Sequence, residues 1–365
     1  LLLPLVQFVG QLFWSGVVDK AGDYKPTLVG TSFLGVFVVL SYLHPAVHGS
    51  LPLLCVVTAL HGFFASTGGP LLDSLSLKVL SENPDSGENY GDQRVWNTIG
   101  WGGMAFIAGA LIDRFGVPAM FFTYSALVLT NAAILMIWMP SVSAAESKNE
   151  VVTENKLADG LRNPEARWLL ANLVIYGMLM ALLENFLNVY LLQDFRNTSG
   201  LLLGLATAVM CAGELPVFKY ADAFMKRTKN GMMKLLVLSE LTLAVRCILY
   251  ALLPASMPWL VLLVEPLHGF TFAGMWCSTV AYAQKLAPPG TEARMQALLN
   301  GLFFQLSFAL GSLCWGFVVK APAQGGLGFR RSFCLDAVAV VAWVLVWQRG
   351  LQRTKRRETP SLAAA

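Results

Sequence analysis

Charge is scarce in this sequence. Asp, Glu, Lys and Arg make up 13% of the 365 residues, whereas a soluble globular domain carries about 25%. Hydrophobic residues reach 56%, and the mean hydropathy is +0.59. Such a chain holds more apolar side chains than a single soluble core can bury. The low charge therefore excludes an ordinary water-soluble enzyme or binding domain.

Common catalytic and nucleotide-binding motifs are also missing. The sequence has no P-loop, no H-E-x-x-H and no G-x-S-x-G, so nothing indicates ATP hydrolysis or a hydrolase. Its six cysteines all lie in apolar stretches, where a free Cys packs as a small apolar residue. We therefore predict no enzymatic activity, no disulfide framework, no metal site and no cofactor. The net charge of +4 forms no basic patch on a soluble face, so we expect no nucleic acid partner.

Long apolar runs are what the chain has instead. A bilayer is crossed by roughly 18 to 20 apolar residues, and lipid forces such a segment to satisfy its own backbone groups as a helix. The sequence therefore predicts an all-α, multi-pass protein embedded in a lipid bilayer. We expect eleven transmembrane helices, at residues 1–18, 27–46, 51–72, 95–112, 117–139, 168–192, 199–221, 232–253, 259–283, 295–319 and 332–347.

One connection is much longer than the others. Residues 140–167 are polar and contain "SVSAAESKNEVVTENK", followed by apolar residues at helical spacing that predict a cytoplasmic surface helix. We expect an N-terminal helical bundle at 1–139, this linker at 140–167, a C-terminal bundle at 168–350 and a basic tail at 351–365. Five spans precede the linker and six follow it, so an absent first helix would restore a six plus six arrangement.

Basic residues set the expected orientation, because Lys and Arg are retained in cytoplasmic loops. Of the 26 Lys and Arg, 20 lie in one set of alternate connections and the tail, 5 lie in the other set, and Arg246 lies inside a span. We therefore place the linker and the C-terminus in the cytoplasm. The sequence does not indicate which membrane holds the protein.

The first charged connection carries a family motif. Within "SGVVDKAGDYKP" at 15–26, the pattern Ser15-x-x-x-Asp19-Lys20-x-Gly22 with Lys25 resembles the cytoplasmic loop between the second and third helices of the major facilitator superfamily, G-x-x-x-D-[RK]-x-G-x-[RK]-[RK]. On this alignment Leu1 begins the second helix. Ser15 replaces the usual first Gly.

Five further blocks resemble one branch of that superfamily. They are "PLLDSLSLKVL" at 70–80, "YGDQRVWNTIGWG" at 90–102, "GELPVF" at 213–218, "EPLHGFTFAGMW" at 265–276 and "RMQALLNG" at 294–301. The branch includes the lactose, phenylpropionate and nucleoside proton symporters and the major facilitator domain-containing orphan transporters, called MFS_1-like. The resemblance implies two six-helix bundles that work by alternating access, with eleven of the twelve helices present. It also implies a monomer and a cytoplasmic gate, formed by Asp19, Lys20, Gly22, Asp73 and Arg94.

Ionisable residues inside the spans are costly in lipid and usually mark a cavity or a partner. Glu265 and His268 lie three residues apart and share a helix face. Counted at about 1.5 Å per residue, Arg246 and Glu184 lie at a similar depth. A carboxylate beside an imidazole and a guanidinium changes its proton affinity with its surroundings. We therefore predict that Glu265, His268, Arg246 and Glu184 couple transport to protons.

This group resembles the Arg, His and Glu of lactose permease-like symporters, with the Glu and His in reversed order. Two other interpretations stay open: a static ion pair with a packed histidine, and contact with the substrate without protons. Glu214 and Glu240 lie deeper and are predicted to form a second polar cluster.

Amide and aromatic side chains supply the expected substrate contacts. Such groups suit a hydroxylated solute, although they often serve as contacts between helices. The predicted substrate-binding residues are Gln7, Gln11, Trp14, Asn188, Phe272 and Trp276. The sequence as a whole predicts a secondary transporter that couples protons to a small polar organic solute, such as a saccharide or a nucleoside. The alternatives are an uncoupled facilitator and a non-transporting receptor or scaffold on the same fold.

Overall fold

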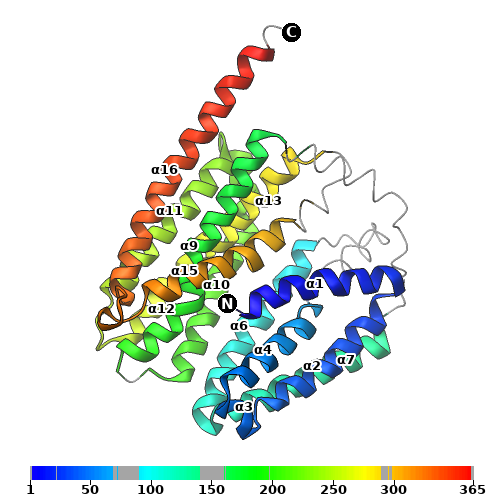
Figure 1. Cartoon of the computed structure of the whole chain (residues 1–365). Helices are drawn as coiled ribbons and strands as arrows, with labels where there is room; N and C mark the ends of the chain where they lie inside the picture. The colour runs from blue at the N-terminus through cyan, green and yellow to red at the C-terminus, as the bar shows by residue number, and fades with distance from the viewer. Residues whose placement is uncertain are drawn as a thin grey trace. The chain divides into compact units, whose positions relative to one another are not determined.

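The computed structural model describes residues 2–21, 23–68, 72, 90–139, 160, 162–196, 198–288, 295 and 298–362, and most of these lie in helices (Figure 1). The chain divides into two compact units. The first comprises Leu1–Gly100 and Ile107–Asn149, and the second comprises Trp101–Phe106 and Glu150–Ala365.

Six helices of the described chain contribute to the first unit: α1 (Leu2–Ala21), α2 (Tyr24–Ser41), α3 (Pro45–Gly49), α4 (Leu51–Ala65), α6 (Tyr90–Phe115) and α7 (Pro118–Trp138). The middle of α6, Trp101–Phe106, belongs to the second unit. Helix α4 packs against α1 and α2, and α2 also packs against α7.

The charged residues at the start of α2 have a structural explanation. The Asp23 side chain caps the helix by accepting a hydrogen bond from the Lys25 backbone N–H at 3.0 Å, which satisfies one of the free donors of the first turn. The Lys25 ammonium donates to the Met139 carbonyl at the end of α7, at 3.1 Å. Helix α2 therefore begins earlier than the predicted residue 27.

The second unit begins with three long helices, α9 (Pro164–Asp194), α10 (Gly200–Arg227) and α11 (Gly231–Leu252). Asn163 and Ser199 cap the first two through their side chains. The last helix, α16 (Phe329–Leu362), packs along α9 and α11. It continues without a break past residue 350, where we predicted a separate tail. The predicted linker up to residue 159 lies outside the described residues.

The segment Pro258–Leu286 is one membrane span built from several helix types. It comprises η3 (Pro258–Leu260), α12 (Val261–Val264), η4 (Glu265–Leu267), the π-helix η5 (Gly269–Gly274) and α13 (Met275–Leu286). A second π-helix, η6 (Gly301–Ser307), leads into α15 (Phe308–Val318). Pro266 contributes to the irregularity because it has no backbone N–H to donate. Short π segments are frequent at functional sites.

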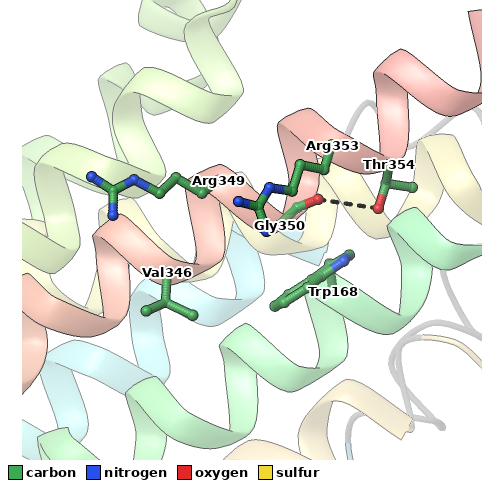
Figure 2. A pocket seen from close by; sticks show the side chains of 6 residues that line it. All are labelled: Trp168, Val346, Arg349, Gly350, Arg353 and Thr354. Carbon is green, nitrogen blue, oxygen red and sulfur yellow. Dashed lines mark hydrogen bonds between the residues drawn. The ribbon is translucent and has the colours of Figure 1, made fainter.

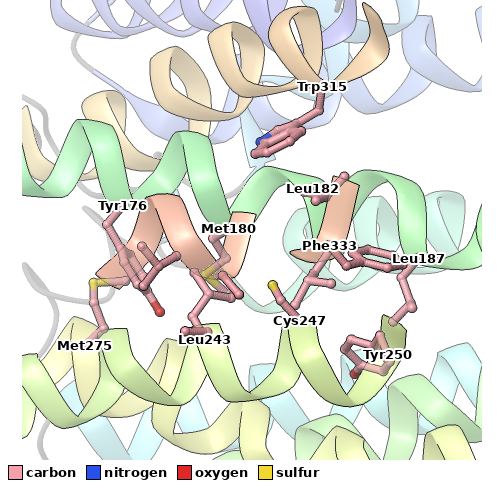
Figure 3. Packing of buried hydrophobic residues seen from close by; sticks show 14 of the residues in the cluster. Tyr176, Met180, Leu182, Leu187, Leu243, Cys247, Tyr250, Met275, Trp315 and Phe333 are labelled. Carbon is pink, nitrogen blue, oxygen red and sulfur yellow. The ribbon is translucent and has the colours of Figure 1, made fainter. Parts of the chain in front are cut away.

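Buried side chains of the second unit form one large cluster between α9, α11 and α16. In lipid such packing stabilises the helices through close contact and hydrogen bonds rather than through exclusion of water. The Tyr176 hydroxyl donates to the Thr271 carbonyl at 2.7 Å, and the Tyr190 hydroxyl donates to the Tyr250 carbonyl at 3.1 Å. Figure 3 shows the centre of this cluster, with Tyr176, Met180, Leu182, Leu187, Leu243, Cys247, Tyr250, Met275, Trp315 and Phe333.

Eight helices of the described chain are long and apolar enough to cross a membrane, and α4 and residues 2–11 of α1 form shorter apolar helices. Within the described residues, each of the eleven predicted spans overlaps at least one helix, although residues 332–347 of α16 are not among the eight apolar ones. The prediction of an all-helical, multi-pass membrane fold is confirmed. All six cysteines are unpaired.

Candidate functional site

A buried arginine lies at the centre of the polar residues in the second unit. Arg246 projects from α11 and is 1% exposed. Its Nη1 donates to the Thr271 hydroxyl at 2.9 Å and lies 3.0 Å from Nδ1 of His268. Its Nη2 donates to the Tyr250 hydroxyl at 3.2 Å and to Oε2 of Glu265 at 3.3 Å. A guanidinium buried in this way requires such partners, because an unpaired buried charge is strongly destabilising.

Both carboxylate oxygens of Glu265 have partners. Oε2 accepts from Arg246, and Oε1 accepts from the Tyr250 hydroxyl at 3.0 Å. Glu265 is 2% exposed and begins the 3₁₀ segment η4. Tyr250 therefore bridges the two charged groups, since its hydroxyl accepts from the arginine and donates to the glutamate.

The imidazole of His268 lies between the arginine and two further carboxylates. Its Nδ1 is 3.0 Å from Arg246 Nη1 and 3.4 Å from Glu184 Oε1, and its Nε2 is 3.2 Å from Glu214 Oε1. These residues come from α9, α10, α11 and the segment around η4. We call Glu184, Glu214, Arg246, Glu265 and His268 the charged cluster.

Two glycines bring α10 close enough for Glu214 to reach the histidine. A Cβ at residue 269 would overlap the backbone carbonyl of Gly213. A Cβ at residue 213 would lie 2.6 Å from the backbone oxygen of Pro266. Because neither glycine has a side chain, the backbones approach directly, and Glu214 and His268 each neighbour one of these glycines in sequence. Small residues allow the same close approach in many membrane helix pairs.

Formal charges in the cluster do not balance when every acid is ionised. Three carboxylates and one guanidinium give −3 + 1 = −2, with the histidine neutral. A buried site of low dielectric does not hold such an excess charge. The cluster can approach neutrality by taking up protons on its carboxylates or its imidazole. No group of three or more metal-ligating side chains is present among the described residues.

The four residues predicted for proton coupling thus lie together, and Glu214 joins them. Its predicted pairing with Glu240 is wrong. Glu240 instead accepts from the Asn172 amide at 2.5 Å, and the Asn172 oxygen accepts from the Trp343 indole at 2.8 Å. The depth count assumed 1.5 Å per residue throughout, whereas η3 and η4 rise about 2.0 Å per residue and carry His268 about 3 Å deeper.

The predicted substrate residues of the second unit differ in their surroundings. Phe272 stacks on the His268 ring with centroids 5.6 Å apart, and Trp276 follows at 6.4 Å. Phe303 and Phe304 of η6 extend this row of rings, with Phe304 lying 5.3 Å from Trp276. Asn188 is exposed on α9 and lies outside these contacts.

The other predicted residues belong to the first unit. Gln7 and Gln11 are half-buried on α1. The Trp14 indole donates to the Phe63 carbonyl at 2.9 Å, which joins α1 to α4. Of the predicted gate, Gly22, Asp73 and the side chains of Asp19, Lys20 and Arg94 lie outside the described residues.

Two members of the polar network, Tyr250 and Thr271, were not predicted from the sequence. Tyr250 lies four residues after Arg246, and Thr271 lies three residues after His268, so each shares a helix face with a residue that was selected. The helical spacing could therefore have identified both. Asn172 and Trp343 carry no such signal, because Asn172 reaches Glu240 from α9 and Trp343 reaches Asn172 from α16.

Comparison with known proteins places the chain in a family. Residues 1–325 match the MFS_1 like family. The chain is 28% identical over 362 residues to a maltose permease of Geobacillus stearothermophilus, covering 98% of this chain and 86% of the permease. It is 27% identical to the major facilitator superfamily domain-containing protein 6-like of Danio rerio, covering 89% of this chain and 59% of that protein.

Solved structures share the fold. The nucleoside transporter NupG matches with a TM-score of 0.73 at 16% identity, covering 96% of this chain and 88% of NupG. The POT family transporter PepTSo matches with a TM-score of 0.71 at 12% identity, covering 97% and 88% of the two chains. These relatives are transport proteins, which confirms the prediction that the chain is not an enzyme. The chain belongs to the MFS_1 like family and is a multi-pass membrane transporter of the major facilitator type.

Proposed function

We propose that this transporter couples the movement of protons to that of a small polar organic solute, a saccharide or a nucleoside-like molecule. The observation that supports this most directly is the position of His268. One buried imidazole lies within 3.4 Å of a guanidinium and of two carboxylates. A histidine in this environment can exchange partners when it gains or loses a proton.

The two ring nitrogens suggest how this exchange works. When His268 is neutral, Nδ1 accepts from Arg246 and Nε2–H donates to Glu214. When the ring is protonated, Nδ1–H can no longer accept, and it donates to Glu184 at 3.4 Å. Arg246 then keeps only its hydrogen bonds to Glu265, Tyr250 and Thr271. Protonation would therefore move one hydrogen bond from the arginine to Glu184.

Glu184 is the member of the cluster through which protons would enter. Its side chain is 22% exposed, whereas those of Arg246, Glu265 and His268 are 1%, 3% and 4% exposed. A carboxylate with partial access to water can exchange protons with the solvent and pass them to the adjacent imidazole. Glu265 and its partners would respond to the change in charge without reaching the solvent.

The proposed solute class rests on two observations. The row of Phe272, Trp276 and Phe304 offers aromatic faces beside a polar cluster, which is the usual composition of a small-molecule site. A maltose permease is similar to this chain over 98% of this chain's length. A saccharide is therefore the first solute to test, followed by a nucleoside.

The test uses the protein in proteoliposomes with a pH-sensitive dye in the lumen. Maltose, other saccharides and nucleosides are added outside in turn, and a coupled solute should acidify the lumen. Glu184→Gln should abolish net proton uptake and leave exchange of labelled solute measurable, because it removes the carboxylate through which protons would enter. Asp222→Asn is the matched control, because its carboxylate lies on α10 in an exposed ion pair with Lys226; it should behave as the unchanged protein.

Other outcomes would overturn the proposal. Solute exchange without any proton movement in the unchanged protein would indicate an uncoupled facilitator. Neither binding nor movement of any solute would indicate a receptor or scaffold. Normal coupling in Glu184→Gln would contradict the proposed proton route through Glu184 and His268.

A further inference from the structure

A basic pocket lies between α9 and α16, at the end of the second unit from which α16 extends (Figures 1 and 2). It has a volume of about 510 Å³. Its lining combines two guanidinium groups with an indole, a small apolar side chain and a hydroxyl: Arg349, Arg353, Trp168, Val346 and Thr354, with Gly350 at its base. None of these residues belongs to the charged cluster.

The pocket is a built feature of the helix junction. The Trp347 indole donates to the Trp168 carbonyl at 3.0 Å, which joins α16 to α9. A Cβ at residue 350 would overlap the Trp168 ring, so the glycine lets the indole lie directly on the α16 backbone. The Thr354 hydroxyl donates to the Gly350 carbonyl at 3.1 Å. Trp168 is therefore held in place beside the two arginines.

Both arginines are available to a ligand. They lie four residues apart and so project from one side of α16. Within the described part of the chain, neither guanidinium has a carboxylate within 4 Å. The acid at this junction, Glu165, already accepts from the Tyr282 hydroxyl at 2.8 Å and pairs with Lys355 at 3.6 Å. The pocket therefore carries two uncompensated positive charges.

An apolar groove lies beside an earlier part of the same helix. It lies between α11 and α16, measures about 620 Å³ and is lined only by apolar side chains, among them Val245, Ile248, Val338, Val341 and Leu345. The series 341, 345, 349 and 353 follows one i, i+4 row of α16, and the series 338, 342, 346, 350 and 354 follows the next. Two rows of the helix thus pass from an apolar groove into a basic pocket.

This arrangement matches an amphipathic anion. We propose that the pocket binds the phosphate headgroup of an anionic glycerophospholipid, with an acyl chain in the groove between α11 and α16. Two guanidiniums hold a phosphate through paired hydrogen bonds. Basic pockets between membrane helices are known to bind acidic headgroups, and a tryptophan suits the depth of the headgroup layer. Free inorganic phosphate would share the headgroup chemistry but leave the groove empty.

The experiment measures lipid retention by native mass spectrometry of the detergent-solubilised protein. Phosphatidylglycerol and phosphatidylcholine of equal chain length are added at matched concentrations. The unchanged protein should retain phosphatidylglycerol preferentially, and Arg349→Ala/Arg353→Ala should weaken that retention about thirtyfold, on the basis of two basic side chains near a membrane surface. Lys226→Ala/Arg227→Ala removes the same charge at the end of α10 and should leave retention unchanged.

Further variants and a competition experiment distinguish a bound lipid from a free phosphate ion. Arg349→Lys/Arg353→Lys keeps the charge but loses the paired hydrogen bonds, so it should weaken retention by an intermediate factor; it also serves if the alanine pair fails to fold. Leu345→Gln should weaken retention of the lipid, because it places an amide among the apolar side chains of the groove. Displacement of the lipid by millimolar phosphate would assign the pocket to a free anion. Equal loss in the control pair would show that net charge alone is responsible, and either result overturns the proposal.

Discussion

Arg246 is the side chain on which the charged cluster depends most. It is almost completely buried and contacts an acid, a hydroxyl pair and an imidazole. In the membrane interior its positive charge is what makes the neighbouring Glu265 tolerable as a carboxylate. Burying either charge alone would be strongly unfavourable, and each charge offsets that cost for the other. The ion pair therefore need not add net stability to the fold.

A double substitution tests this interpretation. Arg246→Met should destabilise the protein by about 3–5 kcal/mol, because it leaves Glu265 buried without a counter-charge. Arg246→Met/Glu265→Gln should recover a large part of that loss. The measurement is the thermal midpoint of the monodisperse protein in detergent. Lys226→Met, at an exposed pair, should change the midpoint little. Equal or additive losses in the single and double variants would contradict the compensation.

Four members of the charged cluster were predictable from their positions along the helices. Glu265 and His268 were found by their spacing, and Arg246 and Glu184 by their depth in neighbouring spans. The contacts made by Glu214 and Glu240 were not predictable, because they depend on how α9, α10 and α16 approach. Glu240 accepts from the Asn172 amide of α9, and Asn172 in turn accepts from the Trp343 indole of α16. No local sequence pattern indicates this chain of contacts between three helices.

At the level of helices, the contact of α10 with η4 and η5 positions the charged cluster. Gly213 and Gly269 allow backbone-to-backbone approach there. The sequence predicted one continuous span over residues 259–283, whereas this segment of the structure contains two 3₁₀ segments and a π-helix. Periodicity does not reveal such changes in helix type, because the apolar pattern is nearly the same in all three.

Gly269→Ala should disturb this contact. The added methyl group meets the Gly213 backbone, which cannot move aside as a side chain would, so we expect a loss of about 1–3 kcal/mol in stability and a weaker proton response in the proteoliposome assay. Gly103→Ala is the control, since a Cβ there has nothing within 4 Å, and it should be neutral or slightly stabilising. Equal effects of the two alanines would show that the close approach is unimportant.

For the molecule as a whole, the sequence predicted the class and the family correctly. These properties follow from composition, the length of apolar runs and motifs spread over the chain. An error in placing one helix end or one contact does not change them. The proposed bundles at 1–139 and 168–350 and the gate formed by Asp19, Lys20, Gly22, Asp73 and Arg94 remain proposals. The orientation in the membrane is a proposal as well, since it rests on the distribution of charge alone.

That orientation can be measured directly. With 20 of the 26 basic residues on one side, we expect the C-terminus in the cytoplasm. A green fluorescent protein fused to the C-terminus of the protein in a bacterial host should fluoresce, and an alkaline phosphatase fused at the same point should be inactive. A fusion after residue 327, in a connection predicted to be external, should give the opposite pattern. Active phosphatase at the C-terminus would reverse the assigned topology.

The length of α16 has a mechanical consequence. Its 34 residues span about 51 Å at 1.5 Å per residue, whereas the hydrocarbon layer is about 30 Å thick. In Figure 1 its red C-terminal part continues beyond the other helices of the second unit. A small tilt of this helix within the membrane would therefore displace its C-terminal end by a larger distance than it displaces the part inside the bilayer. A fluorophore attached near residue 360 would report small rotations of the second unit as displacements large enough to measure by energy transfer.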